Sequence, residues 1–187
     1  MAHLRSLPED ATLRDVFATY PEQMLHLNGF AEAVMRGPCQ LSEGERELIA
    51  AYVSGLNACN YCLGVHAATA GAFGVEEDLF AALLDSVEAA PVAERLKPIL
   101  RYVKKLTESP SRMVPADAEA VYAAGWDDSA LFHAIAICAY FNLMNRIVDG
   151  SGCSAGESYF KAASRRLADH GYRDMRRQVG ADASAEG

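Results

Sequence analysis

Apolar residues recur at helical spacing along almost the whole chain. Leu13, Val16 and Phe17 share one face of a segment that Thr12 opens, and the segment 21–37 repeats the same spacing. Such a stripe is typical of helices, because positions i, i+3, i+4 and i+7 point to one side. No stretch of the sequence alternates apolar and polar residues between hairpin turns, so no sheet is predicted. The sequence therefore predicts an all-α protein.

Cap residues and helix breakers divide this pattern into eight or nine helices. Ser42 and Glu45 have the spacing of a capping box, in which both side chains bind backbone N–H groups where a helix begins. Asp127 or Asp128 is expected to cap a nearly unbroken apolar segment, which we predict to be the central helix. The expected helices cover residues 12–20, 21–37, 42–57, 59–74, 76–88, 92–109, 115–126, 128–150 and 154–171.

The C-terminal part of the chain contains one more helix and a tail. Ser154 and Glu157 have the spacing of a second capping box, so the last helix is expected to begin at residue 154. With 187 residues, of which 51% are hydrophobic, the chain has enough material for one core. The final residues are almost free of large apolar side chains. We therefore expect a single all-helical domain over residues 1–178 and a disordered tail over residues 179–187.

The charge balance limits the partners that the protein can have. The formal net charge is −8 and the isoelectric point is near 5.1, which argues against a general phosphate-binding surface. No run of about eighteen apolar residues is present, and the first residues contain no signal-peptide core. We expect a cytoplasmic protein that binds neither nucleic acid nor a membrane.

The chain has five cysteines, of which Cys59 and Cys62 form a CxxC pair. In a reducing compartment, such a pair indicates redox or metal chemistry more often than a structural disulfide. Cys39 and Cys138 are expected to be small core residues, and Cys153, after a Gly-Ser-Gly turn, is expected to be exposed. The chemistry is therefore expected at the CxxC pair.

The segment CNYCLGVH places three reactive groups on one helix face. Cys59, Cys62 and His66 occupy positions i, i+3 and i+7 if a helix begins near Cys59. The pKa of a thiol falls near a helix N-terminus or a protonated His, so we expect Cys62 to be acidic. His66 can exchange a proton with that sulfur, and Glu47 from the preceding helix can orient the imidazole or take the proton onward. These residues indicate a thiol with a proton relay.

Glu47, Cys59, Cys62 and His66 resemble the pattern of the alkylhydroperoxidase D-like and carboxymuconolactone decarboxylase superfamily. Its redox-active members carry a Glu, then a CxxC pair, then a His four residues after the second Cys. The segment FNLMNRIVDGSG is also similar to the end of a buried helix in the branch called peroxidase-related enzymes. The resemblance extends from about Pro21 to about Tyr172. It implies an all-helical subunit that assembles as a homotrimer or a hexamer.

The resemblance also implies an activity, the reduction of organic hydroperoxides. Cys62 would attack the peroxide, and Cys59 would resolve the sulfenic acid into a disulfide. Glu47 and His66 would form the proton relay, and an external dithiol or a protein reductant would restore the thiols. Some members have a second His between the cysteines, where this chain has Tyr61. A Tyr can donate a hydrogen bond but is no base near neutral pH, so Tyr61 is expected to support the site.

Two other functions fit the same residues. The protein could be a redox sensor whose state depends on a Cys59–Cys62 disulfide, without peroxidase turnover. It could also be a metal-binding helical protein, since two thiolates, His66 and Glu47 could complete a tetrahedral zinc site. The peroxidase interpretation itself requires neither a metal nor a cofactor.

Overall fold

The computed structural model describes residues 1–76 and 78–173 of the chain. The expected domain end at residue 178 and the expected disordered tail, 179–187, lie outside these residues. Within them the protein is all-helical and has no strand, as the sequence predicts. The described helices are α1 (Leu13–Thr19), α2 (Pro21–Arg36), α3 (Glu43–Leu56), α4 (Asn60–Ala72), α5 (Leu79–Asp85), α6 (Lys97–Glu108), α7 (Pro115–Ala123), α8 (Asp128–Ser151) and α9 (Glu157–His170), with 3₁₀ turns at Glu94–Leu96 and Pro110–Arg112.

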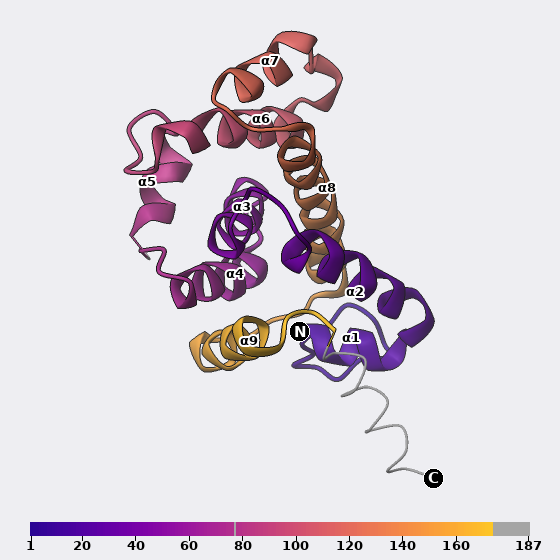
Figure 1. The fold of residues 1–187 in the computed structure, drawn as a ribbon. Helices are drawn as coiled ribbons and strands as arrows, with labels where there is room; N and C mark the ends of the chain where they lie inside the picture. The colour runs from indigo at the N-terminus through magenta and orange to yellow at the C-terminus, as the bar shows by residue number, and fades with distance from the viewer. Residues whose placement is uncertain (77, 174–187) are drawn as a thin grey trace.

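The centre of the fold is the antiparallel pair α3 and α4 (Figure 1). Helix α8 packs along α3, α6 crosses both α3 and α8, and α9 covers α4 on the side of the N-terminal segment (Figure 1). Small residues such as Ala50 and Ala51 are fully buried in α3 and let its neighbours approach closely. The two helices that carry the predicted site residues are thus enclosed by the rest of the chain.

The prediction that α8 is the central helix is wrong. Ten of the 14 residues of α3 are buried, against 12 of the 24 residues of α8. Phe132 and Leu143 of α8 are exposed, so its apolar character covers its outer face as well. By length and composition α8 is also apolar enough to cross a bilayer, yet 56% of its most apolar window is buried in this fold. Helix α8 therefore supplies one wall of the core, and α3 is its centre.

The helix starts follow the predicted caps in two of three cases. The Ser42 hydroxyl accepts the Glu45 N–H at 3.2 Å, and the Ser42 N–H donates to Glu45 Oε2 at 2.8 Å, which confirms the capping box of α3. At α8 the cap is Asp127, whose Oδ1 accepts the N–H of Ala130. Each cap satisfies backbone N–H groups that have no partner inside the helix.

The capping box predicted for the last helix is wrong. Helix α9 begins at Glu157 with Gly156 as its N-cap, two residues later in the chain than a cap at Ser154 predicts. The backbone N–H of Ser154 donates instead to the carbonyl of Ala11 at 3.0 Å. Ser154 therefore belongs to a loop that binds the N-terminal segment, and that tertiary contact outweighs the local capping signal.

Helices α4 and α9 lie close together at Gly64. A Cβ atom at residue 64 would lie 2.5 Å from the ring of Phe160 in α9, which is shorter than any ordinary carbon contact. Gly71 also lies in α4, but a Cβ atom at residue 71 would have no other atom within 4 Å. The absence of a side chain at residue 64 thus sets the spacing of the two helices.

We expect Gly64→Ala to lower the free energy of unfolding by about 1–2 kcal/mol, because overlap with Phe160 outweighs the gain in helix propensity. Gly71→Ala is the matched control on the same helix and should raise it by about 0.5–1 kcal/mol. Urea denaturation of both variants measures the difference. Equal effects of the two substitutions would contradict this account of the α4–α9 contact.

Candidate active site

Helix α4 begins directly after Cys59, as the CxxC spacing requires. Cys59 is the N-cap residue, and Cys62 is the third residue of the helix. The preceding Ala58 has φ of +55°, a left-handed conformation that is rare for a residue with a side chain. The N–H of Cys59 donates to the carbonyl of Ser54 at 3.0 Å and holds this tight turn to the end of α3. The two thiols thereby lie at the start of a helix.

The two thiols differ in their access to solvent. Cys59 is fully buried, whereas Cys62 is 3% exposed and lies in the wall of a cavity. Both are free thiols in this structure and hydrogen-bond to each other. A molecule that enters the cavity therefore meets the sulfur of Cys62, with that of Cys59 behind it.

Mutual contact moves the pKa values of the two thiols in opposite directions. The pKa of Cys59 is lowered, chiefly because the Cys62 thiol hydrogen-bonds to it. The pKa of Cys62 is raised well above its ordinary value by that same bond and by burial, and a hydrogen bond with Asn145 does not offset them. These directions differ from our expectation that Cys62 is the more acidic thiol, since it is Cys59, at the positive end of α4, whose pKa is lowered in the reduced pair.

The carboxylate of Glu47 is fully buried and has three partners. His66 Nδ1 lies 2.7 Å from Oε2. Arg36 Nη2 donates to Oε1 at 2.7 Å, and the Tyr172 hydroxyl donates to the same oxygen at 3.0 Å. Burial alone would raise the pKa of Glu47, but the hydrogen bonds and charges of His66 and Arg36 outweigh it and lower that pKa. Glu47 is therefore a buried anion.

The bond to Glu47 decides which nitrogen of His66 is available for chemistry. An ionised carboxylate can only accept, so Nδ1 carries the hydrogen and Nε2 is the acceptor of a neutral ring. Within the described residues Nε2 has no hydrogen-bond partner, and His66 lines the same cavity as Cys62. The ring of Phe141 packs edge-on against the imidazole at 4.4 Å, and Tyr172 is stacked at 6.4 Å. The structure thus brings Glu47, His66 and Cys62 together in the predicted order.

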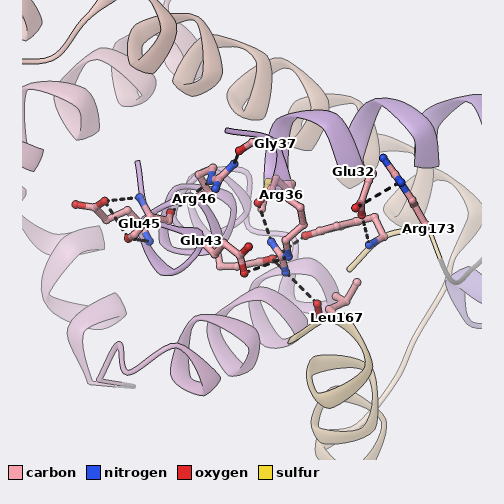
Figure 2. Close-up of polar contacts among 12 residues, drawn as sticks. Glu32, Arg36, Gly37, Glu43, Glu45, Arg46, Leu167 and Arg173 are labelled. Atoms are coloured by element: carbon pink, nitrogen blue, oxygen red, sulfur yellow. Dashed lines mark hydrogen bonds and ion pairs between the residues drawn. The ribbon is translucent and has the colours of Figure 1, made fainter. Parts of the chain in front are cut away.

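Arg36 and Tyr172 were not predicted from the sequence. Figure 2 shows Arg36 reaching from the end of α2 towards Glu43 of α3 and Leu167 of α9, whose carbonyl accepts at 3.1 Å. The guanidinium also lies over the Tyr172 ring, 5.1 Å from its centre. Both residues are brought to Glu47 by the tertiary fold, so no spacing pattern in the nearby sequence predicts these contacts. The one available clue was a basic residue, Arg36, 11 positions before the Glu47 that we predicted to orient His66.

The chain turns back over the site after α9. Gly171 has φ of +65°, and a Cβ there would lie 2.7 Å from Glu32 Oε2, so the turn favours glycine. The N–H of Tyr172 donates to the same Glu32 oxygen at 2.8 Å, and Arg173 lies within ion-pair distance of Glu32 (Figure 2). These contacts hold Tyr172 over Glu47.

Tyr61 lies in the cavity wall but not at the relay. Its hydroxyl accepts the N–H of Leu13 at 3.1 Å, and its ring packs on those of Tyr159 and Phe160. Burial raises the pKa of Tyr61 well above its ordinary value, so the phenol stays protonated. Tyr61 therefore fixes the start of α1 against α4, which is a supporting position.

A chain of amide groups lies behind the thiols and was also not predicted. Asn145 Nδ2 donates to the Ser54 hydroxyl at 3.0 Å, and Asn145 Oδ1 accepts from Asn57 at 2.9 Å. Asn57 also donates to Asn142 at 3.2 Å. Since Asn145 contacts Cys62 as well, this network holds the sulfur in place from α3 and α8.

The cavity in front of Cys62 and His66 is small and mostly apolar. Its volume is about 60 Å³, and it opens between α1, α4, α8 and α9. No Asp or Glu is among its lining residues. These are Leu13, Phe17, Asn28, Tyr61, Cys62, Val65, His66, Tyr140, Phe141, Met144, Tyr159, Ala163, Arg166, Leu167 and Tyr172.

The zinc alternative has no ligand set in the described part of the chain. No three His, Cys, Asp or Glu side chains converge there as they do around a metal ion. Both oxygens of Glu47 are already bound, by His66 on one side and by Arg36 and Tyr172 on the other. In this arrangement Glu47 is a hydrogen-bond partner of His66, Arg36 and Tyr172.

The other three cysteines lie away from the relay. Cys138 is buried and hydrogen-bonds with Thr107, and Cys39 is half-buried, in keeping with core positions. Cys153, which we expected to be exposed, is half-buried. Its pKa is raised to about 11 by burial and by nearby negative groups, Asp15 first among them. None of the three lines the cavity.

Comparison with known proteins identifies the core of this site. Residues 21–105 match the model of the carboxymuconolactone decarboxylase family, a span that runs from α2 into α6 and includes Glu47, Cys59, Cys62 and His66. Through these residues the chain is similar to that family. No curated protein matches the sequence.

Several solved structures share the fold of this chain. An uncharacterised peroxidase-related protein from Silicibacter sp. TM1040 is 26% identical, with 79% of this chain and 78% of that one covered and a TM-score of 0.73. An alkylhydroperoxidase AhpD core protein from Ralstonia eutropha JMP134 is 24% identical, with coverage of 81% and 79% and a TM-score of 0.73. A protein of unknown function from Agrobacterium tumefaciens is 19% identical, with coverage of 76% and 96% and a TM-score of 0.63. The fold is thus AhpD-like.

We expect Glu47→Gln to lower the free energy of unfolding by about 3–5 kcal/mol, because the buried Arg36 loses its anionic partner. The folded-state pKa of Glu47 lies below its ordinary value of 4.5, so its contribution is present above that pH and is lost as the pH falls through the folded value. The difference between wild type and variant should therefore shrink below about pH 4.5 in denaturation experiments. Glu157→Gln, at an exposed ion pair, is the control and should change little.

We expect Cys59→Ser to shift the pH profile of Cys62 alkylation to lower pH. The substitution removes the negative sulfur that raises the pKa of Cys62, and alkylation follows the thiolate fraction. Iodoacetamide labelling at a series of pH values, read by mass spectrometry of the peptide with residue 62, measures the shift. Cys39→Ser is the control; an unchanged profile in Cys59→Ser would refute the coupling.

Proposed function

We propose that this protein is a thiol peroxidase that reduces organic hydroperoxides with Cys59 and Cys62. The observation that carries the proposal is that Cys62 shares a cavity with His66, whose imidazole binds the fully buried carboxylate of Glu47. The match of residues 21–105 to the carboxymuconolactone decarboxylase family model and the AhpD-like fold support a peroxidase-related enzyme. The proposed reaction follows from where each group lies.

In the first step the sulfur of Cys62 attacks the terminal oxygen of the hydroperoxide. The S–O bond forms as the O–O bond breaks, and the proton of the Cys62 thiol passes through His66 Nε2 to the departing alkoxide. The products are an alcohol and the sulfenic acid of Cys62. Glu47 holds the imidazole in the tautomer that accepts this proton and stabilises the positive ring that forms briefly.

In the second step Cys59 attacks the sulfur of the sulfenic acid. A disulfide between Cys59 and Cys62 forms as the S–O bond breaks, and the departing hydroxide becomes water by taking from the solvent a proton equivalent to the one that Cys59 lost when it became a thiolate. The lowered pKa of Cys59 favours this step, because the resolving sulfur is already a thiolate beside its target. In this mechanism the buried Cys59 is the resolving thiol, and Cys62 in the cavity wall is the thiol that reacts with the peroxide.

An external dithiol or protein reductant returns the disulfide to two thiols by exchange. A reducing cytoplasmic setting, which we infer from the sequence alone, would supply such a reductant. Assembly as a homotrimer or hexamer also stays a prediction. Phe30 on α2 and Phe132 and Leu143 on α8 are exposed apolar side chains that a neighbouring subunit could cover.

We expect the purified protein to consume dithiothreitol when an organic hydroperoxide is added. Cys62→Ser should abolish this turnover, because the attacking sulfur is gone. His66→Ala should lower it by about 10²- to 10⁴-fold through loss of the proton-transfer group. In Cys59→Ser a sulfenic acid should persist on Cys62, and labelling with dimedone followed by mass spectrometry detects it.

Cys39→Ser is the control for loss of a half-buried thiol away from the cavity, and its turnover should equal that of the wild type. Circular dichroism of each variant separates lost chemistry from lost folding. Equal turnover in the wild type and Cys62→Ser would refute the proposed function. Peroxide-driven disulfide formation without repeated dithiol consumption would favour the redox sensor in its place.

A further inference from the structure

Arg166 lies in the wall of the cavity that Cys62 and His66 share. It is half-buried on α9, and its Nε atom is fully buried without a hydrogen-bond partner in the part of the chain that the structure describes. No carboxylate there forms an ion pair with it, although the sequence has 25 acidic residues against 17 Lys and Arg. A buried donor without an acceptor is unfavourable and is found at sites that bind something else.

The two other arginines near this side of the core donate hydrogen bonds to protein acceptors, although Arg36 Nε has only an ion-pair contact of 3.7 Å with Glu43. Arg36 donates to Glu47 and to the carbonyl of Leu167. Arg46 donates to the carbonyls of Val34 and Gly37 at the end of α2. Arg166 differs from them, since it lines the cavity and has no hydrogen bond or ion pair to another of the described residues.

A second donor lines the same cavity. Asn28 of α2 is only 3% exposed, and its side-chain Nδ2 is buried and unpartnered within the described residues. No Asp or Glu is found among the lining residues, so the cavity holds donors and a cation but no anion. A planar guanidinium pairs best with a carboxylate, which can accept two parallel hydrogen bonds.

The remaining walls limit what else the ligand contains. Phe17, Val65, Phe141 and Met144 are apolar, and the cavity measures about 60 Å³. An apolar cavity of ~150 Å³ is known to hold benzene, so the ligand here is slimmer than an aromatic ring. A few aliphatic carbons between two polar ends fit this space.

We propose that Arg166 binds the carboxylate of a short aliphatic hydroperoxide and thereby directs its peroxide group to Cys62. Asn28 supports the same ligand as a hydrogen-bond donor. The peroxide half of this inference rests on the proposed function, whereas the anion site does not. The two are therefore tested by separate measurements.

The anion site is tested by alkylation of Cys62 with iodoacetate and with iodoacetamide. In both reactions the sulfur displaces iodide from the same carbon, and the reagents differ in charge. The ratio of the two rate constants at residue 62, read by mass spectrometry, reports the attraction that the cavity exerts on a carboxylate. The measurement requires no peroxidase activity.

We expect Arg166→Gln to lower the iodoacetate to iodoacetamide ratio roughly tenfold, the effect of losing one charge-assisted hydrogen bond. Arg166→Lys should keep part of the ratio, because it retains the charge without the planar fork. Arg165→Gln removes the same charge from an exposed neighbour on α9 and should leave the ratio near that of the wild type. Equal ratios in Arg166→Gln and Arg165→Gln would overturn the proposal.

A second measurement needs no variant. Propionate should protect wild-type Cys62 against iodoacetamide at lower concentration than propionamide does, and equal protection would overturn the anion site. For the substrate, the unbranched 3-hydroperoxypropanoate and its methyl ester form a matched pair. We expect kcat/KM to favour the acid in the wild type and to lose that preference in Arg166→Gln. Loss of turnover with both compounds while the alkylation ratio holds would count against the peroxidase and leave the anion site standing.

Discussion

A carboxylate with no exposed surface requires partners, and the partners of Glu47 organise this protein. Taking an ion out of water costs several kcal/mol unless charges and hydrogen bonds replace the solvent. Here a guanidinium from α2, an imidazole from α4 and a phenol from beyond α9 supply them. Three segments that are distant in sequence thus meet at one side chain of the central helix. The same contacts that stabilise the fold also fix the histidine that faces the cavity.

The local part of this arrangement could be predicted from the sequence. The spacing of Cys59, Cys62 and His66 places them on one helix, and that helix does begin at the first cysteine. Such inferences succeed because they depend only on helix geometry within a few residues. The capping box predicted at Ser154 is wrong because a tertiary contact between Ser154 and the N-terminal segment competes with it. The prediction that α8 is the central helix is wrong because composition does not reveal which face of a helix the rest of the chain covers.

The nonlocal part could not be predicted. Arg36 and Tyr172 reach Glu47 across 11 and 125 positions of the chain, and no periodicity links such positions. The order of acidity in the thiol pair also depended on which sulfur is enclosed and which one donates to the other. Cys59 at the N-cap and Cys62 in the first turn both lie at the start of α4, so their spacing alone does not show which of the two thiols has the lower pKa.

The position of Tyr172 has a consequence for how the protein matures during synthesis. Chains fold as they leave the ribosome, N-terminal parts first, and the thiols and the imidazole emerge about a hundred residues before this tyrosine. A nascent chain that stops short of Gly171 has its cysteines but lacks the phenol and the turn that cover Glu47. The contacts that enclose Glu47 are therefore complete only once the chain has been synthesised past Tyr172.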